Sequence, residues 1–342
     1  MKITTIGIDL AKSVFQIHGV DSHGKAVLRK KLSRAKMLEF FIKLPPCLIG
    51  MEACGSAHYW ARKLVEMGHT VKLMAPQFVK PYVKANKNDA ADAEAICEAV
   101  SRPNMRFVAI KTEEQQAILS LHRVRQSFVK ARTAQSNQIR GLLSEFGVIL
   151  PRGMADIARR LPELLEKTNL PDSFRELLQR LYQHFKELDK QVEELDQKIQ
   201  LWHRNSAISR QLAEIPGIGP ITASALVASI GDASSFANGR QLAAWLGLVP
   251  KQHSSGGKAL LLGISKRGDC YLRTLLIHGA RAVIRRAEDK PGGTWLSKLL
   301  ARRHKNVAAV ALANKNARIV WALLTHNDRR FRADYVPAVA DA

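Results

Sequence analysis

The sequence of 342 residues contains little cysteine. Its four cysteines (Cys47, Cys54, Cys97 and Cys270) are scattered, with no Cys-X-X-Cys pair and no histidine at zinc-ligand spacing. This pattern excludes a disulfide framework and a structural zinc site. We therefore expect a reducing compartment, with each cysteine buried as a small apolar residue.

Long apolar segments are also missing. No apolar run approaches the roughly 20 residues that a membrane-spanning helix needs. The N-terminus, Met1 to Thr5, leads straight into a strand pattern without the apolar region of a signal peptide. We expect no association with a membrane.

Negative charge is scarce relative to positive charge, and this is the most informative property of the composition. The chain has 53 Lys and Arg against 30 Asp and Glu, a net charge of +23. A protein this basic is suited to bind polyanions, above all nucleic acids. Carboxylates retained in such a chain require a reason, and holding hard divalent cations beside phosphate is the leading one.

Strand and helix patterns alternate over residues 1–105. Three strands of a meander precede alternating helices and strands, which predicts an α/β domain with a mixed sheet. The expected strands are Ile3–Asp9, Val14–Val20, Ala26–Leu32, Cys47–Glu52 and Thr70–Met74, and the expected helices are Ala35–Lys43, His58–Met67 and Asp89–Ser101.

Residues 106–205 are predicted to be a helical linker and coiled coil. A long polar helix is expected over Glu113–Phe146. A heptad seam follows, because apolar residues recur at alternating spacings of three and four. This seam predicts either an antiparallel hairpin with the first helix or self-association, and both can hold. Its members are Leu178, Leu181, Phe185, Leu188, Val192, Leu195, Ile199 and Trp202.

Residues 206–342 are predicted to be helical, with a glycine-rich interruption at Ser255–Gly268. The run Pro216, Gly217, Ile218, Gly219 leads into an apolar helix, Ile221–Ile230. It resembles a helix-hairpin-helix, whose backbone N–H groups grip a DNA phosphate without reading sequence. The alternative is an ordinary turn between helices.

Four carboxylates in the first region are candidate metal ligands. Asp9 and Glu52 each end an expected strand, whereas Asp89 and Asp92 are three apart at the start of a helix and share one face. A pair of divalent ions needs several such oxygen ligands. For Asp89 and Asp92 the alternative is helix capping. An Asp at the end of a buried strand, such as Asp9, costs folding free energy unless its carboxylate binds a partner.

A serine flanked by glycines and cations is the second candidate for chemistry. Ser254 and Ser255 precede Gly256 and Gly257, and between Lys251 and Arg286 eight Lys or Arg face one acid. A phosphodiester can approach such a hydroxyl closely, and nearby cations stabilise charge on phosphorus. The alternative is a phosphate-binding loop without chemistry. The predicted DNA contacts here are Lys258, Lys266, Arg267 and Arg273.

Taken in order, these features resemble one family across essentially the whole chain. The four acids, the heptads, Pro-Gly-Ile-Gly, Ser255-Gly256 and Tyr271-Leu272-Arg273 are similar to the DEDD-type insertion-sequence transposases related to Piv DNA invertases, described as bridge-RNA-guided recombinases. The segment Gly7 to Ser13 alone also resembles the first phosphate motif of sugar kinases and actin-like ATPases. That reading needs a second such lobe and a glycine-rich adenosine motif, which the sequence lacks.

The resemblance implies a RuvC-like ribonuclease-H fold for the first region and a helical transposase domain at the C-terminus. It implies that Asp9, Glu52, Asp89 and Asp92 bind Mg²⁺ or Mn²⁺, and that Ser255 is the nucleophile, with Ser254 as a one-residue alternative. It further implies a guide RNA, composite sites within a homo-oligomer (dimer or tetramer), and a location in the bacterial cytoplasm on DNA. The other candidates are a junction-resolving endonuclease without a serine nucleophile and a non-catalytic nucleic-acid scaffold.

Overall fold

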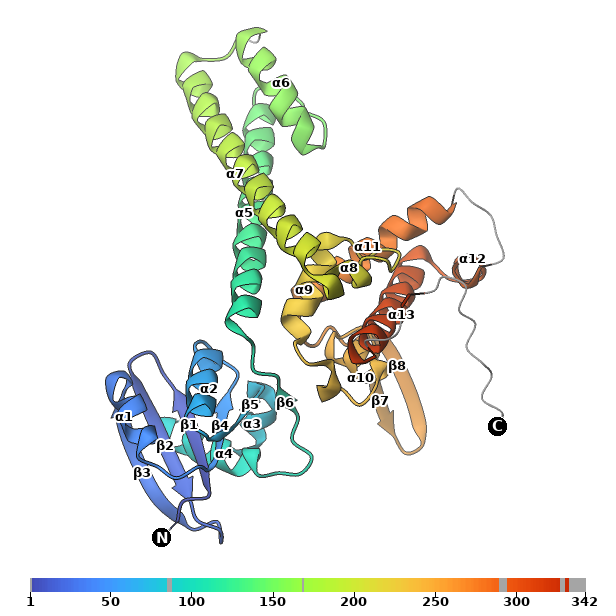
Figure 1. The fold of residues 1–342 in the computed structure, drawn as a ribbon. Coiled ribbons are helices and arrows are strands. Elements are labelled where there is room, and N and C mark those ends of the chain that lie inside the picture. Colours follow the sequence, from blue (N-terminus) through green and yellow to red (C-terminus); the bar gives the residue numbers. More distant parts are fainter. Residues whose placement is uncertain (1, 85–87, 168, 289–293, 327–329, 332–342) are drawn as a thin grey trace. The chain divides into compact units, whose positions relative to one another are not determined.

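The computed structural model describes residues 2–84, 88–167, 169–288, 294–326 and 330–331 (Figure 1). It divides into two compact units. The sheet unit comprises residues 1–115 and 230–237, and the helical unit comprises residues 116–229 and 238–342. Each is described by itself. The predicted division into three regions at residues 105 and 205 stays a prediction.

In the described part of the chain, the sheet unit is built on a six-stranded mixed sheet in the order β3-β2-β1-β4-β5-β6. The first three strands form the expected antiparallel meander, β1, β4 and β5 run parallel, and β6 is antiparallel to β5. The mixed α/β architecture is thus confirmed. The strands are β1 (Thr5–Leu10), β2 (Val14–Val20), β3 (Ala26–Ser33), β4 (Leu48–Glu52), β5 (Thr70–Met74) and β6 (Phe107–Val108).

Helices cover both faces of this sheet (Figure 1). Alternate residues such as Ile8 and Met51 face one side and join the apolar core with Phe41 of α1 and Trp60 of α2. The other face is covered by α4. The helical segments are η1 (Arg34–Lys36), α1 (Met37–Ile42), α2 (Ala57–Glu66), α3 (Pro76–Val79), η2 (Lys80–Tyr82) and α4 (Asp89–Val100).

Two glycines let α4 approach the sheet closely. A Cβ atom at Gly7 would overlap the backbone of Ala93 and Cys97, and one at Gly50 would lie 2.7 Å from the Cβ of Val100. No other residue type fits either position without moving the helix. The position of α4 against β1 and β4 therefore depends on both glycines.

Gly7→Ala is expected to destabilise the protein by roughly 3 kcal/mol, because the added methyl group meets helix backbone rather than a flexible side chain. Chemical denaturation followed by circular dichroism measures the effect. Gly55→Ala is the matched control, since a Cβ there meets nothing within 4 Å. Equal unfolding midpoints for the two variants would show that α4 does not rest on Gly7.

The helical unit contains a long antiparallel hairpin of helices (Figure 1). The helices concerned are α5 (Glu113–Ser144), α6 (Met154–Lys167) and α7 (Asp172–Asn205). Most of the predicted heptad seam is buried within the single chain, where Leu178 and Phe185 pack with Ile139 of α5. The ion pairs Arg125–Asp196 and Arg132–Asp189 join the same two helices. The structure therefore shows the intramolecular alternative for this seam.

The rest of the C-terminal region is mainly helical, as predicted. Its elements are α8 (Ala207–Leu212), α9 (Pro220–Ile230), η3 (Ala233–Ser235), α10 (Gly239–Trp245), α11 (Cys270–Glu288), α12 (Trp295–Leu300) and α13 (Lys305–Thr325). The expected glycine-rich interruption is instead a β-hairpin of β7 (Pro250–Ser255) and β8 (Lys258–Ile264). Gly256 and Gly257 both adopt positive φ (55° and 78°), as the two-residue turn of a hairpin requires.

A chain of hydrogen bonds crosses the helical unit. Ser224 Oγ on α9 donates to the carbonyl of Pro220, 2.7 Å away, so it accepts from His122 Nε2, at 3.1 Å. His122 Nδ1 then accepts from the hydroxyl of Tyr271, at 3.0 Å. Tyr271 is also hydrogen-bonded to Arg125. This chain fixes the neutral tautomer of His122 and links α5, α9 and α11.

His122 is expected to make stability depend on pH. Burial, and then the charge of Arg125, lowers the pKa of His122 to about 4 from 6.5. Between those values the unfolded chain binds the proton and the folded chain does not, so stability falls as pH decreases from 6.5 to 4, by up to roughly 3 kcal/mol. Denaturation at several pH values should show a flatter dependence for His122→Gln than for the wild type. Parallel curves would contradict this origin.

One described helix is long and apolar enough to cross a membrane by length and composition, namely α13, although the sequence pattern indicated no such segment. Its inner face is buried at Ala309, Ala313 and Val320. The amide of Asn316 donates to the carbonyl of Pro216 at 2.9 Å. These contacts are those of a packing helix inside the helical unit.

The cysteines depart from expectation. Cys47 and Cys97 are buried, whereas Cys54 and Cys270 are exposed, and all four are free thiols. The expectation that every cysteine is buried is therefore wrong for two of them. Cys54 lies in the turn after β4, and Cys270 is the first residue of α11, so both are at the end of an element and not inside it.

Candidate metal centre and serine hairpin

Strand periodicity and the glycine contacts place all four predicted carboxylates on the α4 face of the sheet. Asp9 follows Gly7 by two residues and Glu52 follows Gly50 by two, so each shares the face of its glycine. Asp89 and Asp92 lie in the first turn of α4, which packs on that face. The backbone thus brings two strand ends and one helix start to the same edge of the sheet.

Three of the four carboxylates form a tight cluster. Ligand oxygens of Asp9, Asp89 and Asp92 all lie within 4.8 Å of one another. Carboxylates this close repel one another, by about 1 kcal/mol after screening by water, because Asp89 is exposed and the other two are only half-buried. A basic chain that keeps three acids in this arrangement gains if a cation neutralises them.

Glu52 lies beside the cluster although outside the 4.8 Å group. Burial raises the pKa of Glu52, and the charges of Asp9 and Asp92 raise it further. The same two carboxylates therefore act electrostatically on Glu52, which is half-buried at the end of β4. The structure places all four predicted acids in one neighbourhood.

Capping does not explain the two acids of α4. The N-cap is Asn88, whose side chain accepts a hydrogen bond from the backbone N–H of Ala90 at 3.0 Å. Asp89 and Asp92 are thus not needed to satisfy the helix start.

This donor set fits a hard divalent cation. Carboxylate oxygens are the ligands that Mg²⁺ and Mn²⁺ prefer, and half-buried or exposed side chains leave room for the water that Mg²⁺ retains. Among the described residues no cysteine or histidine joins the group. The set therefore matches hydrolytic or phosphoryl-transfer metals better than zinc.

The Pro-Gly-Ile-Gly turn has a packing role as well as an open side. Gly217 has φ of +90° and lies against Gly279 of α11, where a Cβ would lie 2.9 Å from the carbonyl carbon. The side chain of Ile218 is buried. Gly219, by contrast, has nothing within 4 Å and lies directly before α9. Of the two glycines, only Gly219 therefore faces open space at this turn.

The two serines of the hairpin lie on opposite faces of β7. In the β7–β8 register Ser255 is opposite Lys258 and Ser254 is opposite Ala259. Successive strand residues point to opposite faces, so Ser255 shares its face with Lys258 and His253. Ser254 instead accepts a hydrogen bond from Gln252 at 2.8 Å. Ser255, at the exposed end of the strand, has the cationic neighbour.

The four predicted basic DNA contacts differ in their surroundings. Lys258, Lys266 and Arg267 are exposed. Arg273 is only 8% exposed, and its Nη1 donates to the carbonyls of Leu246, at 3.1 Å, and Arg267, at 2.8 Å. Its observed role is to hold these loops, and a DNA contact from Arg273 stays a prediction.

Gly7 and Gly50 contribute to the site, although neither is among the predicted site residues. Each precedes a strand-end acid by two residues, in Gly7-Ile8-Asp9 and Gly50-Met51-Glu52. This repeated spacing is the signal that indicates them, because each strand has a glycine where α4 packs against it, two residues before the strand-end carboxylate.

Comparisons with known proteins agree over both units. Residues 209–292 match the model of the transposase IS116/IS110/IS902 family, and residues 6–148 match the model of the IS110-type DEDD transposases. A "Probable family 20 transposase" of Pseudomonas aeruginosa is 58% identical over 95% of this chain and 98% of its own length.

Two further relatives are less similar in sequence to this chain. The "Transposase for insertion sequence element IS1328" of Yersinia enterocolitica is 47% identical over 94% of this chain and 97% of its own length. The "Pilin gene-inverting protein" of Moraxella bovis is a distant match, 28% identical over 60% of this chain and 57% of its own length. The chain therefore belongs to the IS110/IS116 family of DEDD transposases, enzymes that act on the DNA of insertion sequences.

Proposed function

We propose that this transposase cuts and rejoins DNA through a covalent serine–DNA intermediate assisted by divalent metal ions. The observation that carries the metal part is the convergence of Asp9, Asp89 and Asp92 within 4.8 Å, with Glu52 beside them. The strand order and the strand-end acids also support a RuvC-like ribonuclease-H fold for the sheet unit.

The four acids would hold Mg²⁺ or Mn²⁺. Bound there, such ions polarise the scissile phosphate and stabilise charge on the attacking and departing oxygens. The protein's own contribution is geometric. Gly7 and Gly50 set α4 against the sheet, and this packing keeps Asp89 and Asp92 near the strand ends.

Ser255 is the proposed nucleophile. Its Oγ loses its proton and forms a bond to phosphorus, one P–O bond of the DNA breaks, and the departing DNA hydroxyl takes up a proton. The serine ester retains the energy of the phosphodiester, so a hydroxyl of another strand can displace the serine without ATP. Lys258, opposite Ser255 in the hairpin, supplies positive charge for the pentacoordinate phosphorus.

The partners follow from charge and from the family. We propose that a structured guide RNA pairs with donor and target DNA, and that the chain works in the bacterial cytoplasm as a homo-oligomer, a dimer or tetramer with composite sites. The net charge of +23 is compatible with binding both RNA and DNA. The three predicted regions, 1–105, 106–205 and 206–342, would carry metal binding, assembly and strand joining.

The second candidate is a RuvC-like junction-resolving endonuclease without a serine nucleophile. The carboxylate cluster favours it, because metal ions and water are sufficient for hydrolysis. The two candidates differ in one product, a covalent protein–DNA adduct.

The experiment is to trap the protein on a supercoiled plasmid that carries element ends and to map the adducted residue by mass spectrometry. An adduct on Ser255 is expected. An adduct on Ser254 would shift the assignment by one residue. Metal-dependent cleavage without any adduct would support the endonuclease instead.

A further inference from the structure

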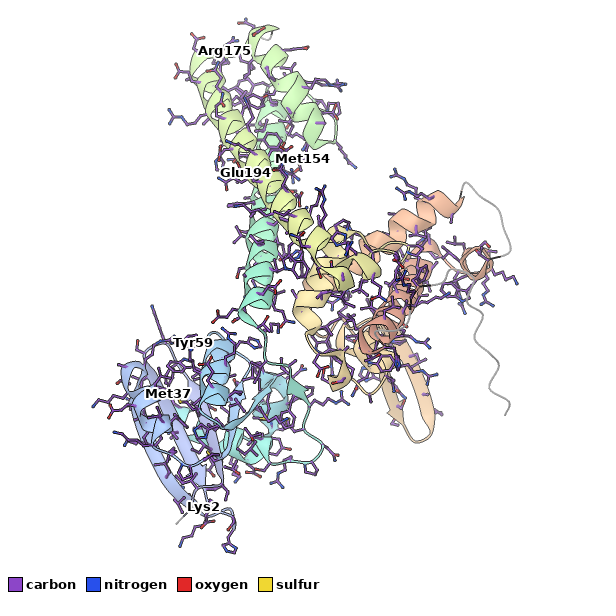
Figure 2. All side chains as sticks on the ribbon, viewed as in Figure 1. Lys2, Met37, Tyr59, Met154, Arg175 and Glu194 are labelled. Atoms are coloured by element: carbon purple, nitrogen blue, oxygen red, sulfur yellow. The ribbon has the colours of Figure 1, made fainter. Side chains whose placement is uncertain are left out.

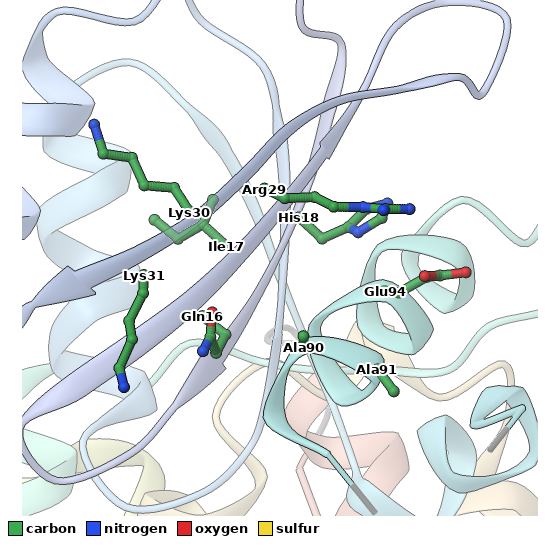
Figure 3. Close-up of a pocket in the computed structure, with 9 residues that line it drawn as sticks. All are labelled: Gln16, Ile17, His18, Arg29, Lys30, Lys31, Ala90, Ala91 and Glu94. Carbon is green, nitrogen blue, oxygen red and sulfur yellow. The ribbon is translucent and has the colours of Figure 1, made fainter. Parts of the chain in front are cut away.

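A hollow of about 350 Å³ lies between β2, β3 and the first turns of α4 (Figure 3). Gln16, His18, Arg29 and Lys31 line it from the strands, and Ala90 and Ala91 line it from the helix. We call these six residues the ledge. Figure 2 shows all the described side chains of the sheet unit on its ribbon.

The ledge adjoins the carboxylate cluster. Asp9 is paired with Gln16, and Gln16 is paired with Lys31, so these three residues form one row across β1, β2 and β3. Paired residues point to the same face, and neighbouring strands are about 4.8 Å apart, which places the backbone of Lys31 roughly 10 Å from that of Asp9. Ala90 and Ala91 lie between Asp89 and Asp92 in the chain.

The ledge carries positively charged side chains, whereas the neighbouring carboxylate cluster is negatively charged. Arg29 and Lys31 both face α4, and in the described part of the chain none of the ion pairs involves either of them. One acid, Glu94 of α4, also lines the hollow, and it is paired with Lys84 at 3.6 Å. In Figure 3 Arg29 points toward α4 beside His18, whereas Lys30 points away.

The remaining lining suits an extended polyanion. His18 is 6% exposed and burial lowers its pKa, so the ring is neutral and offers hydrogen bonds rather than charge. Ala90 and Ala91 leave space above the strands because their side chains end at Cβ. Cations, an amide and a neutral imidazole next to small residues are groups that contact phosphate and sugar oxygens without reading bases.

We propose that the ledge binds the phosphodiester backbone of the DNA strand whose scissile phosphate lies at the carboxylate cluster, on the β3 side of that phosphate. This inference rests on the proposed function. The acids bind metal and the cut phosphate, and Arg29 and Lys31 neutralise the neighbouring phosphates. The DNA strand would then leave the carboxylate cluster along the row formed by Asp9, Gln16 and Lys31.

The test is the salt dependence of DNA binding by the full-length protein, purified with any RNA that it retains. The probe is a fluorescein-labelled duplex carrying one element end, with Ca²⁺ in place of Mg²⁺ to prevent turnover. Each lost phosphate contact reduces the slope of log affinity against log salt by about one. Arg29→Gln/Lys31→Gln should therefore reduce the slope by about two.

Controls separate this effect from net charge and folding. Lys25→Gln/Lys36→Gln removes two charges elsewhere in the same unit and should keep the wild-type slope. The single variant Lys31→Arg, with Arg29 unchanged, should also keep the wild-type slope. Mn²⁺ binding, followed by electron paramagnetic resonance, should be equal in all these variants, because none of the changed residues is a metal ligand.

The outcomes are distinct. An unchanged slope in Arg29→Gln/Lys31→Gln with Mn²⁺ binding intact would overturn the ledge and leave the proposed function standing. A reduced slope for a matched RNA probe but not for DNA would also overturn it. If the wild-type protein bound no Mn²⁺, the proposed function would fail, and the inference with it.

Discussion

Asp92→Asn is expected to abolish metal-dependent DNA cleavage, lowering its rate by roughly 10³-fold or more, because metal ions supply several kcal/mol of transition-state stabilisation. The change keeps the shape of the side chain and removes one charge from a cluster whose oxygens lie within 4.8 Å of one another. Plasmid cleavage in Mg²⁺ and in Mn²⁺ measures the loss.

The same variant should be more stable than the wild type when no divalent metal is present. Removing one of several repelling carboxylates relieves about 1 kcal/mol after solvent screening. Saturating metal should then stabilise the wild type by about 2.7 kcal/mol at a hundred times its dissociation constant, and the variant hardly at all. In thermal melts the variant should therefore have the higher melting temperature without metal, and the wild type should have the higher one with saturating metal.

Glu98→Gln is the matched control on the same helix, where Glu98 pairs with Lys84 and Arg102 instead of joining the cluster. It should keep both cleavage and stabilisation by metal. If Asp92→Asn cleaved DNA at the wild-type rate, the cluster would not be the catalytic centre.

Ser255→Ala is expected to eliminate the covalent protein–DNA adduct and to lower strand joining by at least roughly 10³-fold, because no other group replaces the attacking oxygen. Metal binding by the sheet unit should be unchanged. Denaturing gel electrophoresis of labelled DNA detects the adduct, and sequencing of recombinant junctions detects joining.

Ser254→Ala provides the comparison, since this serine is on the opposite face of β7 and opposite Ala259. It should retain adduct and joining. The reverse result, with Ser254 required and Ser255 dispensable, would assign the other serine. Full cleavage and joining in both variants would exclude a serine mechanism.

Much of the sheet unit was predictable because period-two patterns and strand-end acids are local properties of the chain. The strands from β1 to β5 match their predicted ranges within two residues at either end. The two-residue strand β6 and the four-residue helix α3 were not predicted, since such short elements lack a periodic pattern and are held by tertiary contacts.

The serine segment shows where local patterns fail. Its glycines and serines are typical of an irregular loop, yet Gly256-Gly257 is also a favoured hairpin turn. Likewise the heptads of α7 could not identify their partner, because an apolar seam is satisfied equally by a neighbouring helix of the same chain or of another. Arg273 looked like a DNA contact in a basic run, and only its carbonyl partners reveal its packing role.

The two ion pairs between α5 and α7 are spaced one heptad apart on each helix, Arg125 with Asp196 and Arg132 with Asp189. Two ion pairs at that interval fix the axial register of the two helices relative to each other. The 34 residues of α7 span about 50 Å at the usual helical rise. The paired helices are therefore a rigid spacer of fixed length. A partner bound at the α6 end would lie at a fixed distance from the C-terminal helices.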